Sequence, residues 1–437
     1  MKILAIDHGA FMLDFVLRAQ DDGHEVRWYT IRRLSTWVGK GLATFVGDWR
    51  DHMKWADLVV LPDNTRYIRE IDEWRKKGVL VVGASLAAAE WELNRNVGQA
   101  VFKKHGIPVA PYREFRRYDD AIAYVKKENR RFVSKPCGDE PDKSLSYVAK
   151  SPADMVYMLQ RWKKAQRHKG SFILQEFVGG TEMAVGAWFG PHGFSEGWCE
   201  NWEFKKLMTG DCGPATGEMG TVVRYVKRSK LADKVLKPLE GALEKIAYCG
   251  YVDVNCIIDD KGKPWPLEFT MRPGWPTFNI QQALLHGDTA EWLLDLATGR
   301  DSKPFTLNKV ATGVVMAIPD FPYSKLTKKE VTGIPVYGLD LKKRHPNLHP
   351  CELMKGRAPM DVDGKVVDQE CFVTAGDYLM VGSGVADTVS GSARRAYSTL
   401  KTVSVPNSPF WRPDIGKRLQ EQLPLLQANG YATNLAY

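Results

Sequence analysis

Polar and apolar residues alternate in the stretch PLEFTMRPGW (266–275). Side chains two positions apart on a strand share a face, so Glu268, Thr270 and Arg272 would line one surface while the apolar residues between them pack on the other. Taken alone, this pattern is also typical of a solvated strand face. Other parts of the chain must therefore show whether the polar face has a chemical role.

A second polar pair precedes this stretch. The run YVDVNCIID (251–259) places Asp253 and Asn255 on one face of a strand, and DDKGK (259–263) predicts a hairpin turn into the strand that carries Glu268. Oxygen ligands that converge from adjacent strands suit Mg²⁺, which prefers hard donors and keeps waters and substrate phosphates. The hairpin is thus a candidate metal site.

Three further signals favour a nucleotide or another anionic ligand. Lys135 ends the strand-like run RFVSKP, and the glycines of GPATGEMG (213–220) would let backbone amides approach a ligand closely. In LQEFVGGTE (174–182) a strand leaves the core and a carboxylate, Glu182, follows a double glycine. Such a hinge would offer adenine backbone hydrogen bonds between apolar walls, and Glu182 would accept from a ribose hydroxyl.

The first hundred residues predict a βαβ unit with a parallel sheet. Short β-branched runs, MKILAID, DLVVLPD and VLVVGAS, alternate with the amphipathic stretch 65–78, where Gly78 suits a helix C-cap. The turn after the first strand, DHGAFML, has one glycine and lacks the three spaced glycines of a dinucleotide fingerprint. NAD binding is therefore not supported.

The rest of the chain predicts mixed α and β structure. Ser151 is the expected N-cap of a helix over 152–166, and 171–178 and 183–190 are expected strands. Near the C-terminus, we expect a hairpin within 365–384 followed by a helix over 385–403. The predicted domains are 1–94, 95–182, 183–308 and 309–437.

Composition limits the class of protein. A length of 437 residues allows two to four domains, and 44% hydrophobic with 26% charged residues is ordinary for a globular protein. The net charge of +9 favours anionic partners such as nucleotides or nucleic acid. Seven scattered cysteines without a C-x-x-C pair, and no apolar run of membrane-spanning length, predict a cytoplasmic protein with reduced thiols and no membrane partner.

The order of these motifs resembles the ATP-grasp ligases, and among them the phosphoribosylamine–glycine ligase family. GPATGEMG is similar to that family's GPNTGGMG loop, EFKK (203–206) to its DHKR, and PLEFTMRPG to its VIEFNxRFG. GVVMA (313–317) and FWRPDIG (410–416) are similar to its C-terminal domain. The resemblance implies an α/β fold with an N-terminal βαβ domain, a two-part ATP-grasp core and a small C-terminal α+β domain.

The resemblance also implies residue roles, with ATP and Mg²⁺ (or Mn²⁺) as cofactors. Arg95 and Lys135 would contact the ATP phosphates, Gln175 the adenine amino group, and Glu182 the ribose. Arg272 would grip the substrate carboxylate or acyl phosphate, and Lys205 would meet the developing phosphate charge. The remaining expected contacts are Lys143, Ser144, Glu176, Phe177 and Val178 for ATP, Gly217, Glu218, Met219 and Gly220 for substrate, and Glu268, Asn255 and Thr270 for metal.

The implied reaction has two steps. A carboxylate attacks the γ-phosphorus of ATP to give an acyl phosphate and ADP, and an amine then displaces phosphate to form an amide. Catalysis of this kind is mostly positioning and electrostatic stabilisation. No side-chain nucleophile is needed.

Several motifs depart from the family. The glycine-rich phosphate clamp is replaced by GDEPDKSLSY (138–147), the metal asparagine is Thr270, and the G-D-P-E after the arginine reads GWPT. The N-terminal G-R-E-H turn, which binds the phosphorylated sugar, reads GAFMLD, and G-P-E-x-P reads LPDNTR (61–66). These departures leave the acceptor amine open.

Three functions are consistent with these residues. In the first, the protein activates glycine or another small amino acid and joins it to an amine other than phosphoribosylamine, such as a modified nucleotide or an amine-bearing base in nucleic acid. In the second, it is a true phosphoribosylamine–glycine ligase of purine synthesis. In the third, catalysis is lost and the chain is a nucleotide-binding protein. Turnover with a panel of amino acids and amines would separate them.

Overall fold

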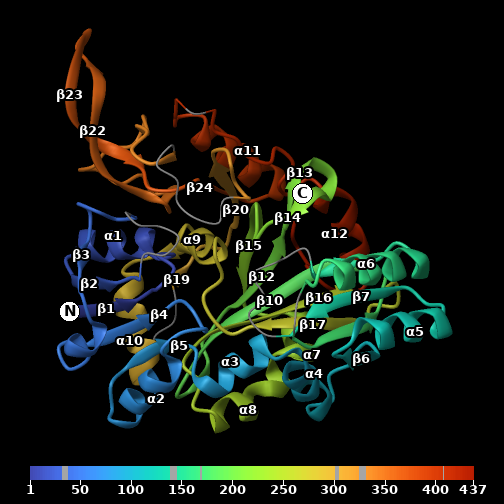
Figure 1. Cartoon of the computed structure of the whole chain (residues 1–437). Coiled ribbons are helices and arrows are strands. Elements are labelled where there is room, and N and C mark those ends of the chain that lie inside the picture. The colour runs from blue at the N-terminus through green and yellow to red at the C-terminus, as the bar shows by residue number, and fades with distance from the viewer. Residues whose placement is uncertain (32–37, 138–144, 168–169, 301–304, 324–330, 407) are drawn as a thin grey trace.

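The computed structural model describes residues 1–31, 38–137, 145–167, 170–300, 305–323, 331–406 and 408–437. Figure 1 shows an N-terminal unit at one side, a small unit at the other, and a large twisted sheet between them. The mixed α/β class expected from the sequence is confirmed. Among the described residues, no helix is both long and apolar enough to cross a bilayer.

The N-terminal unit is a parallel sheet with helices. Its strand order is β3 (Thr44–Phe45), β2 (Glu25–Tyr29), β1 (Lys2–Ile6), β4 (Leu58–Leu61) and β5 (Val81–Gly83). The helices are α1 (Leu13–Asp21), α2 (Ile68–Lys76), α3 (Leu86–Leu93) and α4 (Arg95–Lys104). The βαβ prediction is confirmed. The helix expected over 65–78 is α2, and its C-cap is Lys77 rather than Gly78. Gly78 follows the cap with φ of +88°, a conformation that glycine adopts readily.

The small unit is a four-stranded antiparallel sheet covered by two helices (Figure 1). Its strands are β6 (Tyr112–Phe115), β9 (Phe172–Glu176), β7 (Phe132–Pro136) and β8 (Tyr147–Val148), and its helices are α5 (Tyr118–Glu128) and α6 (Pro152–Lys164). The Ser151 side chain accepts from the Asp154 amide at 3.1 Å, which confirms the predicted N-cap. Lys135 ends β7 and Gln175 lies on β9 beside it.

The large sheet has nine strands. Along it lie β17 (Pro264–Thr270), β16 (Gly250–Ile258), β10 (Thr181–Gly190), β12 (Trp198–Glu203), β15 (Gly220–Val226), β20 (Val310–Ala317), β24 (Tyr378–Ala386) and β21 (Leu348–Pro350), with β11 (Gly193–Phe194) paired to β10. Strands on both sides of residue 308 belong to this one sheet. The domain boundaries themselves stay a prediction.

Helices and small ribbons surround the large sheet. The helices are α7 (Lys230–Val235), α8 (Glu240–Lys245), α9 (Thr277–Gln282), α10 (Thr289–Thr298), α11 (Val389–Leu400) and α12 (Leu419–Ala428). The ribbons are β13 (Lys206–Met208) with β14 (Cys212–Ala215), β18 (Leu285–His286) with β19 (Phe305–Thr306), and β22 (Leu353–Val362) with β23 (Lys365–Thr374).

The predicted hairpin within 365–384 is wrong. Strand β23 pairs with β22, which precedes it, and β24 joins the large sheet between β20 and β21. The turn between β22 and β23 contains Asp363 and Gly364, a dipeptide typical of tight hairpins. Gly356 and Pro359 made 353–362 a poor strand candidate, although a two-stranded ribbon tolerates both at its edge. Figure 1 shows this ribbon projecting from the body.

The two faces of the large sheet differ in chemistry. On one face Glu200 pairs with Arg224 at 2.6 Å and accepts from Ser229, the N-cap of α7. The neighbouring Asn201 points to the other face, because successive strand side chains alternate. Asn201 and the side chains that point the same way on adjacent strands therefore form a second face of the sheet, which we call the polar face.

Aromatic packing attaches β17 to α4. Phe269 and Phe102 are both buried, and their rings stack with centroids 4.0 Å apart. Phe269 lies on the opposite face of β17 from Glu268, as the alternation predicted. The stack thus packs α4, whose first residue is Arg95, against the strand that carries Glu268.

We predict that Phe102→Ala lowers the free energy of unfolding by about 3–5 kcal/mol, because it removes a buried aromatic side chain and leaves a cavity. Urea denaturation followed by fluorescence measures this change. Tyr157→Ala on α6 is the control, since Tyr157 is 58% exposed and its loss should change stability by less than about 0.5 kcal/mol. Equal effects of the two substitutions would contradict the packing described.

Candidate functional site

The polar face of the large sheet gathers most of the predicted site residues. Strand register places Asn201, Ala184, Asn255 and Glu268 in one row across β12, β10, β16 and β17. In the next row, Asp253 lies opposite Thr270. The three predicted metal residues therefore lie within two adjacent rows on one surface, and the hairpin predicted at 259–263 is confirmed.

Lys205 lies among three carboxylates. Its Nζ is 2.9 Å from Glu203, 3.6 Å from Glu182 and 3.5 Å from Glu268. Burial would lower the pKa of Lys205, but these three acids raise it well above its ordinary value. The side chain is therefore held as an ammonium cation by charges on three different segments.

Two further cations meet Glu268 or its strand. Arg95, the first residue of α4, contacts Glu268 with Nη1 at 2.7 Å. Lys135 donates to the Leu267 carbonyl at 3.1 Å and to the Gln175 amide oxygen at 2.9 Å. Burial would raise the pKa of Glu268, yet the surrounding cations lower it well below its ordinary value.

The hydrogen bonds of Gln175 differ from those expected of an adenine contact. Gln175 is buried, its oxygen accepts from Lys135, and its amide nitrogen donates to Gln99 at 3.3 Å. Its side chain thus orients Lys135 in this structure. At the predicted hinge, the amides of Glu176 and Phe177 donate to the carbonyls of Pro111 and Arg131.

The other residues of the predicted hinge lie on the small unit or directly after it. The Glu176 carboxylate pairs with Arg130 at 2.8 Å, and the Arg131 guanidinium lies over the Phe177 ring. Val178 follows them in the connection to β10. Lys143 and Ser144 lie outside the described residues.

The predicted substrate loop lies next to the Lys205 segment. The Thr216 amide and hydroxyl both donate to the Lys205 carbonyl at 2.9 Å, and the Met219 amide donates to Phe204. A Cβ on Gly217 would meet no heavy atom within 4 Å, so this glycine leaves open space beside the backbone. Gly220 is required by the fold, since a Cβ there would lie 2.4 Å from the Gly313 carbonyl oxygen.

Arg272 lies just past the end of β17. Its Nη2 is 3.2 Å from Glu92 Oε1, and the other Glu92 oxygen accepts from the Met271 amide at 2.6 Å. Glu92 belongs to α3, so a helix of the N-terminal unit fixes the direction of this guanidinium. Two cations of the site, Arg95 and Arg272, are thus positioned by α4 and α3.

Sequence reasoning missed three contributors. Glu203 binds Lys205 and accepts from Asn255 Nδ2 at 2.9 Å, and its place in EFKK was the only available signal. Glu92 had no signal, because its partner is distant in the sequence. Arg412, within FWRPDIG, is buried and donates to the Lys206 carbonyl at 3.0 Å. It therefore fixes the segment that begins with Lys205.

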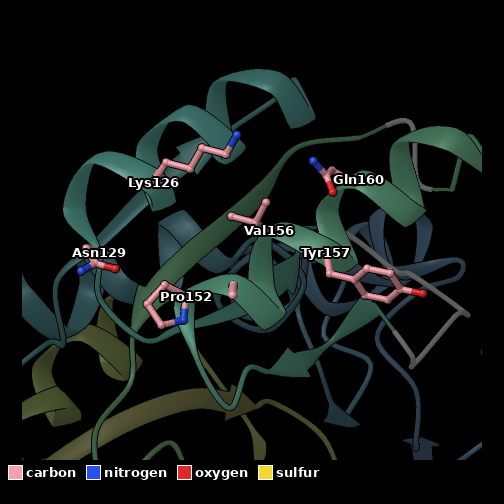
Figure 2. Close-up of a pocket in the computed structure, with 7 residues that line it drawn as sticks. Lys126, Asn129, Pro152, Val156, Tyr157 and Gln160 are labelled. Atoms are coloured by element: carbon pink, nitrogen blue, oxygen red, sulfur yellow. The ribbon is translucent and has the colours of Figure 1, made fainter.

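A separate pocket lies between α5 and α6. Figure 2 shows its lining residues, which are Lys126, Asn129, Pro152, Ala153, Val156, Tyr157 and Gln160. None of them belongs to the polar face. The pocket carries no part of the site described above.

Comparison with known proteins relates the chain to an ATP-grasp family. Residues 94–277 match the ATP-grasp (A) domain of phosphoribosylglycinamide synthetase. These residues form an ATP-grasp domain. Over 364 residues the chain is 27% identical to phosphoribosylamine–glycine ligase of Ralstonia nicotianae, covering 80% of this chain and 81% of that protein. The enzyme of the same name from Salmonella typhimurium is 24% identical over 387 residues, with 85% of each covered.

A solved structure supports the same fold. Phosphoribosylamine–glycine ligase of Thermotoga maritima superposes with a TM-score of 0.74 at 19% identity, covering 95% of this chain and 100% of that one. The chain is thus related to phosphoribosylamine–glycine ligases, as the motif order indicated. The polar face, with Lys205, Glu203, Asn255 and Glu268, lies within the ATP-grasp domain.

We predict that affinity for ATP depends on the charge of Lys135. Burial lowers the pKa of Lys135 to about 8, with Arg95 and Lys205 adding to the fall and Glu268 opposing it. Below pH 8 the Lys135 side chain of the free protein is positively charged, and above pH 8 it is neutral. The affinity for ATP should therefore fall up to about tenfold per pH unit above pH 8. Calorimetric titration with a non-hydrolysable ATP analogue from pH 7 to 9.5 measures this.

Lys135→Gln provides the comparison. The variant should bind the analogue more weakly at pH 7 and show a flat affinity across the same range. A wild-type profile that is equally flat would contradict the role of Lys135.

Proposed function

We propose that the protein is an ATP-dependent carboxylate–amine ligase that forms an acyl phosphate and then an amide. The observation that carries this proposal is the set of cations and carboxylates around Lys205 on the polar face of an ATP-grasp domain. Phosphoryl transfer needs positive charge where phosphate oxygens gather and oxygen donors for a metal ion. The polar face supplies both within a few ångströms.

The residues present fit a magnesium ion. Asn255 Oδ1 is buried and has no hydrogen-bond partner among the described residues, and it lies beside Glu268 in the strand register. Glu268, Asn255 and Thr270 would hold the ion through hard oxygen donors. When bound, Mg²⁺ neutralises charge on the phosphates of ATP.

Binding of ATP would require the cations of the site to exchange their carboxylate partners for phosphates. The carboxylate of Glu268 pairs with both Arg95 and Lys205. We propose that the ATP phosphates draw Arg95, Lys135 and Lys205 toward themselves, which releases the carboxylates to the metal ion. Because each charged group would exchange one oppositely charged partner for another, the exchange avoids the cost of burying an isolated charge.

Arg272 and Lys205 would act on the reacting groups. The Arg272 fork suits a carboxylate or acyl phosphate in two-point contact, and Glu92 holds its orientation. Lys205 would meet the charge that develops on the transferred phosphoryl group. Glu182 would accept from the ribose, and Glu176, Phe177 and Val178 would form the adenine hinge.

Glycine and phosphoribosylamine are the substrate pair that the relatives favour, because both curated relatives described above carry the name phosphoribosylamine–glycine ligase. This alternative is better supported than the change of acceptor that the N-terminal motifs suggested.

One structural observation favours a second candidate function, in which the acceptor is an amine other than phosphoribosylamine. The Phe11 ring covers the turn after β1, so that a Cβ on Gly9 would lie 2.3 Å from Phe11 Cε2. Phe11 also contacts Trp275, with ring centroids 4.9 Å apart. An aromatic side chain and the nearby acid Asp7 offer little to a sugar phosphate at this turn.

We predict that Glu268→Gln abolishes ADP formation, because the amide removes the carboxylate that would hold the metal ion. Release of ADP in the presence of Mg-ATP, glycine and amines measures this. Glu421→Gln, an exposed substitution on α12, is the matched control and should retain full activity. Undiminished ADP formation by Glu268→Gln would place the metal elsewhere.

We also predict turnover with glycine and phosphoribosylamine in a panel of amino acids and amines, followed through ADP and phosphate release. Turnover only with another amine would favour the second candidate. Binding of ATP without turnover on any pair would instead favour a catalytically inactive nucleotide-binding protein and overturn the ligase proposal.

A further inference from the structure

Three buried groups with acceptor oxygens, Asp253, Asn201 and Glu218, lie beside the ligase site, and the first two contact each other. Asp253 is 5% exposed, Asn201 1% and Glu218 6%. The Asn201 amide nitrogen donates to Asp253 Oδ2 at 2.7 Å, and the Tyr251 hydroxyl donates to the same oxygen at 3.1 Å. Asn201 is thus directed at the Asp253 carboxylate, across β12, β10 and β16.

In two of these groups, one buried side-chain oxygen accepts no hydrogen bond from the residues that the structure describes. Within the described part of the chain, neither Asn201 Oδ1 nor Glu218 Oε1 has a hydrogen-bond partner. A buried polar oxygen without a donor costs about 1–3 kcal/mol. Both oxygens are acceptors, and N–H donors of a ligand would satisfy them.

The acidic character of these groups also favours a cationic ligand. Asp253 and Glu218 are both buried acids. Lys205, a cation of the polar face, is engaged with Glu203, Glu182 and Glu268. A cationic ligand would relieve the mutual repulsion of the acids.

The position points to one end of the substrate. Asp253 lies opposite Thr270 on adjacent strands, and Arg272 follows two residues later. Glu218 belongs to the GPATGEMG loop, where the similar family motif GPNTGGMG has glycine. Arg272, the expected carboxylate-binding group, thus lies two residues beyond the position that faces Asp253, an arrangement that would suit a zwitterion.

We propose that Asp253, Asn201 and Glu218 bind the ammonium group of the amino acid whose carboxylate is activated, while Arg272 holds that carboxylate. This inference rests on the proposed ligase function. An ammonium group has three N–H donors and one positive charge, and it would supply what the three acceptors lack. The protein would therefore select an amino acid over the same acid without its amine.

The test compares substrates that differ only in the amine. Acyl phosphate formed from Mg-ATP is trapped with hydroxylamine, using glycine or β-alanine against acetate or propionate. The wild type should have a KM for the better amino acid at least about tenfold below that for its deaminated counterpart. Equal KM values would overturn the proposal.

Variants connect the preference to these residues. Glu218→Gln and Asp253→Asn should each raise the KM for the amino acid roughly 10- to 100-fold and leave the KM for the deaminated acid within about twofold. Asp260→Asn, an exposed substitution in the turn after β16, is the matched control. Equal changes in both KM values would contradict an ammonium site, and circular dichroism verifies that each variant is folded.

A binding measurement separates this inference from the ligase proposal. Calorimetric titration of the wild type with each amino acid and its deaminated counterpart, without ATP, should detect binding of the amino acid alone. If no carboxylate supports acyl phosphate formation, the ligase proposal fails, and the titration still decides the ammonium site. Binding of neither compound, or of both equally, would overturn it.

Discussion

The site is organised by the electrostatic pairing of Lys205 with three carboxylates from different segments. Glu182 is the second residue of β10, Glu203 ends β12 and Glu268 lies on β17, so one ammonium group connects three strands of the large sheet. A cluster of acids at this density would repel itself without such a cation. The arrangement therefore requires a scaffold that holds each strand end in register.

The scaffold meets this requirement from several directions. The stack of Phe102 on Phe269 sets α4, and hence Arg95, against β17. Gln175 orients Lys135 from the small unit. At the C-terminal side, Arg412 and Arg418 both pair with Asp211, while Arg418 donates to the Glu203 carbonyl. The N-terminal, small and C-terminal parts thus all contact the segments that carry the charged groups.

Local patterns predicted much of this architecture. Alternation of polar and apolar residues placed Glu268 and Thr270 on one face of β17, and the Asp259–Lys263 turn followed from composition. The Ser151 cap depends on neighbouring residues only, so it too was readable. By contrast, the pairing of β23 with β22 was missed, because the glycine and proline in β22 obscured its strand character.

Long-range contacts limited the prediction of the site. Glu92 reaches Arg272 across 180 positions of sequence, and Gln175 turns to Lys135 because their strands pair. Neither contact leaves a local pattern. The motif order carried the family, whereas the partner of each side chain depended on the packing of units that are remote in sequence.

The central claim is that nucleotide and metal exchange partners with the charges now paired around Lys205. A crystal structure with Mg²⁺ and a non-hydrolysable ATP analogue tests it most directly. We expect phosphate oxygens next to Arg95 and Lys135, and the metal ion on Glu268 and Asn255 Oδ1. A nucleotide bound elsewhere, with Lys205 still paired to Glu182, Glu203 and Glu268, would contradict the account.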